Sequence, residues 1–289
     1  MTRLAKTLIL TALLAIGSPA LAQGNGYSES ITLSGFSAVY GAMAPHASPL
    51  SFDLVGYDPR LTGQVQIVST PAPSVFVQVR SRDWVGGGLG AELKYEFDVV
   101  GPSNAFVPIA YLAHFNLRPM SFLHGATGQF VLTAYSVGFG NSQSVYADLK
   151  CDQSCRTTAQ PSGTGSATST VSVNVGGSTY STLGGTASYG TISGVLMAPT
   201  NSVGLGFGLV SLRVSAGGSW SDGTGWAFLD PRFEVDPAYL AVNPGASIQI
   251  MAGVGNESGV MPVPEPGAAL LMLVGLAGLA FAARHRHMR

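Results

Sequence analysis

Residues 92–99 read Glu92-Leu93-Lys94-Tyr95-Glu96-Phe97-Asp98-Val99 and alternate strictly between charged and apolar side chains. A period of two puts the apolar set on one face of an extended strand and the charged set on the other. This pattern is typical of an antiparallel sheet that packs one face and exposes the other to water. The stretch therefore predicts a half-buried strand in a fold built from sheets.

The same alternation recurs on both sides of this stretch, at Ser74–Arg80, Thr170–Val175 and Leu212–Val214. Val107–Phe115 and Phe130–Phe139 are more continuously apolar, which is expected of central strands. The chain holds 38 glycines and 17 prolines, and many of them form turn signals between these runs. Many short strands with frequent turns predict an all-β, antiparallel sandwich or barrel.

Two segments depart from this pattern. Pro237–Ala241 predicts one short helical turn, with Asp236 as its N-cap and Pro237 at the first helical position. Between Arg156 and Gly194, 25 of 39 residues are Ser, Thr or Gly, as in flexible linkers. Strand alternation persists inside that segment, so we expect Ser/Thr-faced edge strands with a loose loop around 157–168. A boundary between two small β domains is the alternative.

The charge composition excludes some kinds of partner. Only 10% of the residues are charged, and 14 basic residues nearly balance 15 acidic ones. No basic run or stripe is present, so no nucleic-acid partner is expected. Hydrophobic residues make up 46% of the chain, which is ample for a packed core and argues against wholesale disorder.

The first 22 residues predict a secretory signal peptide. Two basic residues precede a short apolar run, and Ala20-Leu21-Ala22 forms an A-x-A cleavage site. The expected partners are a secretion translocon and a signal peptidase that cuts before Gln23. A buried N-terminal helix is the alternative. The apolar run is too short for a membrane span, which needs about 20 residues.

The last 30 residues have three parts in order. Pro264-Glu265-Pro266-Gly267 comes first, then the uncharged run 268–283, then a basic end with Arg284, Arg286 and Arg289. The two prolines keep Glu265 in an extended, accessible backbone. The apolar run would extend about 24 Å as a helix, a short transmembrane span. The arginines act as a stop-transfer signal and should stay in the cytoplasm.

This tail resembles the PEP-CTERM sorting signal of Gram-negative bacteria. The resemblance implies that an exosortase, a membrane protease, cuts the chain near Pro264–Pro266 and passes the protein to the cell exterior. Such proteins commonly accompany exopolysaccharide and biofilm production. A plain C-terminal membrane anchor is the alternative.

Two further stretches resemble PEP-CTERM ectodomains of jelly-roll type. They are Leu93–Pro102, followed by Val107-Pro108-Ile109, and Leu229–Leu240, which continues through Asn243-Pro244-Gly245 to Gly253–Asn256. The resemblance implies one jelly-roll-like sandwich across most of the body.

Cys151 and Cys155 are the two cysteines of the chain. Export favours a disulfide between them. The closed loop is short, so the bond should act as a local clip on a turn. A metal or redox pair is the alternative, although the spacing has neither the second half of a zinc site nor a C-x-x-C motif.

Candidate chemistry in the body is sparse. The indole rings of Trp220 and Trp226 flank a turn-like segment and could stack on sugar rings; a core or hairpin pair is the alternative. Three carboxylates lie close together in the sequence and could serve a hydrolase: Asp230, Glu234 and Asp236. The alternative is that they form turns and face solvent. His114 lies in an apolar run and is expected to be structural. No cofactor or metal site is expected.

The sequence therefore predicts three parts: a signal peptide at 1–22, a β-sandwich ectodomain at 23–259 and a sorting tail at 260–289. Without both ends, the body carries a net charge of −5. We expect an exported, non-enzymatic surface or extracellular-matrix protein with an inner-membrane-anchored precursor and a mature form at the cell surface or outside. A surface carbohydrate-binding module, with extracellular polysaccharide as its partner, is the alternative.

Overall fold

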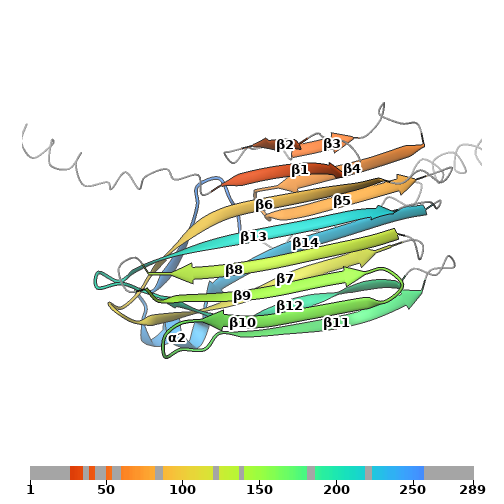
Figure 1. The fold of residues 1–289 in the computed structure, drawn as a ribbon. Helices are drawn as coiled ribbons and strands as arrows, with labels where there is room; N and C mark the ends of the chain where they lie inside the picture. Colours follow the sequence, from red (N-terminus) through yellow and green to blue (C-terminus); the bar gives the residue numbers. More distant parts are fainter. Residues whose placement is uncertain are drawn as a thin grey trace, which may run out of the picture. The chain divides into compact units, whose positions relative to one another are not determined.

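The structure is a computed structural model that describes residues 27–34, 39–42, 50–53, 60–81, 87–119, 124–136, 140–180, 186–218 and 223–256. These residues form two antiparallel sheets, seen as two layers in Figure 1. Sheet A has the order β10(Cys155–Gly163), β9(Ser142–Cys151), β8(His124–Tyr135), β13(Leu205–Gly218), β6(Gly87–Val100), β1(Ser28–Ser34) and β2(Val39–Ala42), and β15(Ser247–Ile250) also pairs with β6. Sheet B has the order β11(Thr170–Tyr180), β12(Thr186–Pro199), β7(Phe106–Arg118), β14(Gly223–Val235), β5(Ser74–Ser81), β4(Leu61–Val68) and β3(Leu50–Asp53). The all-β, antiparallel prediction is confirmed.

Strand β6 follows from its alternation. Its odd-numbered residues from Leu89 to Val99 are buried, and its even-numbered residues from Gly90 to Val100 are partly or fully exposed. The predicted strands at Ser74–Arg80, Thr170–Val175 and Leu212–Val214 lie in β5, β11 and β13. Val107–Phe115 and the part of the second run up to Tyr135 occupy inner positions, since β7 lies between β12 and β14, and β8 between β9 and β13. Residues 137–139 of the second run lie outside the described residues.

One hydrophobic core lies between the two sheets. Tyr95 and Phe97 of β6 meet Phe233 of β14, with ring centroids 6.3 and 5.5 Å apart. Tyr111 of β7 meets Phe130 of β8 at 5.6 Å in the same way. Each of these pairs joins sheet A to sheet B, so the inward residues of both sheets pack into a single cluster.

The Ser/Thr/Gly-rich segment 156–194 forms the border strands β10 and β11 and most of β12. Figure 1 shows β10 and β11 together at one border of the two layers, with β2 and β3 at the opposite border. The predicted edge strands are present, but the loose loop at 157–168 is wrong for residues 157–163. Those residues pair with β9 in continuous register from Cys155–Cys151 onward. Strands β13 and β14, which follow the segment, lie between strands that precede it, so the segment does not separate two sets of strands.

The predicted helical turn is α2(Pro237–Val242). The side chain of Asp236 accepts hydrogen bonds from the backbone N–H groups of Ala238 and Tyr239, and Pro237 begins the helix, as expected. Of the residues that the structure describes, none forms a helix with the length and apolar character needed to cross a membrane. The predicted span at 268–283 lies outside the described residues.

Candidate functional site

The predicted processing residues are outside the part of the chain that the structure describes. This holds for Ala20 and Ala22 at the signal cleavage site, for Pro264–Gly267, and for the basic end at Arg284, Arg286 and Arg289. The predicted boundaries at 22/23 and 259/260 lie outside it as well. These assignments therefore remain predictions from the sequence.

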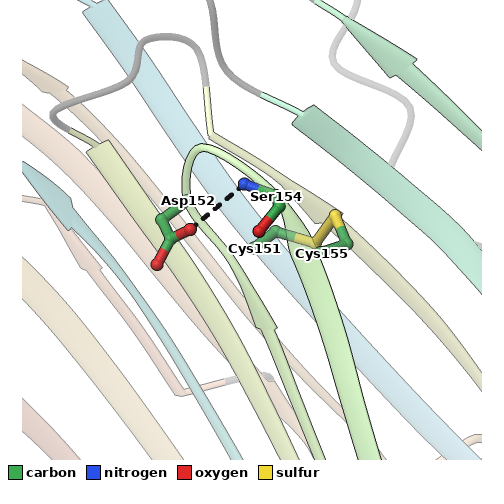
Figure 2. Close-up of a disulfide and its surroundings, with 4 residues drawn as sticks. All are labelled: Cys151, Asp152, Ser154 and Cys155. Carbon is green, nitrogen blue, oxygen red and sulfur yellow. Dashed lines mark hydrogen bonds between the residues drawn. A yellow bond between two sulfur atoms is a disulfide. The ribbon is translucent and has the colours of Figure 1, made fainter.

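The structure joins Cys151 and Cys155 in a disulfide, with a sulfur–sulfur distance of 2.12 Å (Figure 2). Cys151 ends β9, Cys155 begins β10, and the two are direct partners in the ladder between these strands. The side chain of Asp152 accepts a hydrogen bond from the backbone N–H of Ser154 at 3.1 Å, as Figure 2 shows. That bond lowers the pKa of the Asp152 carboxyl below its ordinary value. The disulfide thus closes a hairpin whose turn has its own hydrogen bond.

Trp226 does not present its ring to a ligand in this structure. Only 5% of the residue is exposed, and its ring lies 6.2 Å from that of Phe76 on the neighbouring strand. The ring of Trp226 therefore has a structural contact with Phe76, and its burial argues against sugar stacking by this residue. Trp220 lies outside the described residues.

The three carboxylates proposed for a hydrolase each have a separate contact. Asp230 is only 1% exposed, and its Oδ1 accepts a hydrogen bond from the backbone N–H of His114 at 3.1 Å and lies 3.3 Å from His114 Nδ1. Glu234 lies 3.5 Å from the guanidinium of Arg232, and Asp236 caps α2. These contacts fit structural roles for all three residues. These contacts link His114 of β7 to Asp230 of the neighbouring strand β14.

A pocket of about 290 Å³ lies beside β9 and β10, next to the loop that leads into β11. Gln143, which is almost fully buried, donates from its amide nitrogen to the backbone carbonyls of Thr164 and Ala167 and accepts from the hydroxyl of Ser169. The lining consists of Gln143, Pro161, Ser162, Gly163, Gly165, Ala167, Thr168 and Ser169. The lining supplies hydroxyl, amide and backbone groups, and Gln143 is used to fix the loop. Within the described ranges, no cluster of His, Cys, Asp and Glu could hold a metal ion.

Sequence reasoning missed an aromatic pair on the outer face of sheet A, of which Tyr135 is exposed and Phe207 is partly buried. Tyr135 of β8 and Phe207 of β13 are ladder partners, with ring centroids 6.1 Å apart and ring planes inclined by 29°. Strand parity would have placed each ring outward, because the preceding Ala134 and the following Gly208 are buried. No sequence signal indicated that these two strands are neighbours.

Comparison with protein families matches residues 262–286 to the PEP-CTERM protein-sorting motif. Comparison with curated proteins finds no relative. The matched residues include Pro264–Gly267, the apolar run and the first two of the three arginines, so the resemblance found in the sequence is confirmed. The motif supports an exported protein that is sorted at its C-terminus from a membrane-anchored precursor. PEP-CTERM motifs are associated with exosortase processing, which supports a membrane protease as a partner.

Proposed function

We propose that this chain is a non-enzymatic structural protein of the cell surface or extracellular matrix, in the setting of exopolysaccharide and biofilm production. The single observation that carries the proposal is the sorting motif at residues 262–286. A body with a net charge of −5 suits export as a soluble domain. The structural contacts of Asp230, Glu234 and Asp236 favour this reading over a hydrolase.

We also propose that the exported body is a jelly roll, as the resemblance implies. A jelly roll winds eight strands as two Greek keys into two sheets. The inner strands support this, because β5, β6, β7 and β8 enter sheets B, A, B and A in turn. The later strands β12, β13 and β14 again enter B, A and B and insert beside them. A body of this kind presents two broad sheet faces to the outside.

Processing at the tail tests the proposal. We expect Glu265→Gln to retain the precursor in the membrane, because Glu265 is the charged residue of the extended motif that the protease reads. Glu257→Gln is the matched control, since it makes the same change outside the matched residues. The measurement is the intact mass of the protein in the supernatant and in membranes, with and without the exosortase.

The expected wild-type supernatant form begins at Gln23 and ends near Pro264–Pro266. Release of Glu265→Gln at the wild-type level, or a full-length tail in the membranes of both strains, would contradict sorting by this motif. Biofilm mass and polysaccharide retention of a deletion strain then test the matrix role. Equal biofilm mass and equal polysaccharide retention with and without the protein would contradict the matrix role.

A further inference from the structure

Five neighbouring strands of sheet A place one residue each in a single line on the outer face. The line runs Ser142 on β9, Tyr135 on β8, Phe207 on β13, Asp98 on β6 and Gln249 on β15, and each is the ladder partner of the next. We refer to these five residues as the Tyr135 row. Neighbouring strands lie about 4.8 Å apart, so the row extends about 19 Å across the strands.

The centre of the Tyr135 row is an uncovered aromatic surface. Tyr135 is 39% exposed, and its ring lies 6.1 Å from the partly buried ring of Phe207. A cross-strand aromatic pair stabilises a sheet whether or not it binds anything. The rings alone therefore do not identify a ligand, and the neighbouring charged groups are needed to infer its chemical class.

Two carboxylates lie on one side of the rings, both on β6. Asp98 lies in the row beside Phe207, and Glu96 lies on the same face of β6, two residues away. Burial raises the pKa of the Tyr135 hydroxyl above its ordinary value, and the charges of Glu96 and Asp98 raise it further. Among the described residues neither carboxylate forms an ion pair with a basic side chain. Lys94, the one lysine of β6, pairs with Glu92 at 2.8 Å.

The ends of the row add neutral hydrogen-bonding groups. Gln249 is exposed and carries an amide, and Ser142 carries a hydroxyl. Together the row offers an apolar ring surface, carboxylates that accept hydrogen bonds from hydroxyl donors, and neutral donors at both ends. A sugar ring has the matching groups: an apolar C–H face for the rings and hydroxyls for the carboxylates.

From this juxtaposition we infer that the Tyr135 row binds a neutral polysaccharide chain that lies across the strands of sheet A. Negatively charged polymers are disfavoured, because Glu96 and Asp98 would repel them. A basic peptide would use the carboxylates, but it would gain little from the amide and hydroxyl at the ends. The inference deepens the proposed extracellular function, on which it rests, and gives the protein a polysaccharide partner with a defined surface.

Binding of the mature protein from culture supernatant tests the inference. The probes are hydroxyethyl cellulose and galactomannan as neutral polysaccharides, polygalacturonate as an acidic one and polylysine as a cationic one. We expect binding to at least one neutral probe, and no binding to polygalacturonate. Tyr135→Ala should weaken it about tenfold, which is typical of removing an aromatic anchor. Asp98→Asn should weaken it several-fold, and Tyr135→Phe should keep it because the ring remains.

Tyr189→Ala is the matched control. Tyr189 is 49% exposed and lies on β12 of the other sheet, so its replacement should leave binding unchanged. Failure of both neutral probes, binding that survives Tyr135→Ala, or binding of polylysine alone would overturn the inference. Secretion of each variant at the wild-type level shows that sorting is intact, so a failure here is distinct from a failure of the proposed function.

Discussion

Two buried tyrosines in facing sheets differ in what their hydroxyl groups contact. The hydroxyl of Tyr111 donates to the backbone carbonyl of Thr170 at 2.7 Å. The hydroxyl of Tyr95 is buried and has no hydrogen-bond partner in the described part of the chain. A buried polar group without a partner costs free energy, whereas a made hydrogen bond contributes about 1 kcal/mol. The same substitution should therefore have opposite effects at the two sites.

We expect Tyr95→Phe to leave the free energy of unfolding unchanged or to raise it by up to about 1 kcal/mol. Tyr111→Phe should lower it by about 1 kcal/mol, because the carbonyl of Thr170 loses its donor. Urea unfolding of both variants at pH 7 measures the difference. Equal destabilisation by the two substitutions would contradict this account.

The same two tyrosines determine the direction in which the stability of the fold changes with pH. Burial raises the pKa of both hydroxyls above their ordinary value of 10.0. Above that pH the unfolded chain loses protons that the folded chain keeps, so stability should fall as the pH rises through the alkaline range. Tyr95→Phe removes one of these ionisations and should make the fall less steep. The measurement is the midpoint of urea unfolding between pH 8 and 11.

At the scale of single elements, the hairpin of β9 and β10 is closed by the disulfide of Figure 2. We expect Cys155→Ala to lower the free energy of unfolding by about 2 kcal/mol at most, the chain-entropy value for so short a loop. Cys151→Ser should cost more, because Cys151 is buried in the core and the serine hydroxyl would lie there. Urea unfolding with and without reductant checks both. The reduced wild-type protein should have the same free energy of unfolding as Cys155→Ala. If reductant also lowered the stability of Cys155→Ala, loss of the disulfide would not be the cause of the reductant effect.

Local sequence patterns predicted whether a segment forms a strand or a helix, but they did not predict which strands lie beside each other. The alternation of Glu92–Val99 gave the inward face of β6, and the Asp236-Pro237 pair gave the start of α2. The loop expected at 157–168 was wrong in its first half, because composition does not record that Arg156 to Gly163 continue a hairpin with β9. Tyr135 and Phe207 meet because β13 returns between β6 and β8. Such pairing depends on the whole topology, which periodicity along one strand does not contain.

At the scale of the whole molecule, Gly255 and Asn256, where the described part of the chain ends, form hydrogen bonds to the body. The side chain of Asn256 accepts from the backbone N–H of Phe233 at 2.9 Å and donates to its carbonyl. The N–H of Gly255 donates to the carbonyl of Ser69 at 2.8 Å. These bonds link the chain after β15 to β14 and to the loop before β5. In the described part of the chain, these closing contacts are made before the matched sorting residues begin at 262.

We therefore expect a chain ended after Gly259 to fold, to be exported and to reach the periplasm as a soluble protein without exosortase. A chain ended after Ala252 lacks the three bonds of Gly255 and Asn256 to the body, and it also lacks the bond from the N–H of Val254 to the carbonyl of Met251 and the packing of Val254 against the core. The three bonds to the body alone, at about 1 kcal/mol each, predict a loss of at least about 3 kcal/mol in the free energy of unfolding. Urea unfolding of both purified proteins measures the difference. Equal stability would mean that the body is complete before Asn256, and unfolding of the longer chain would mean that the sorting tail contributes to the fold itself.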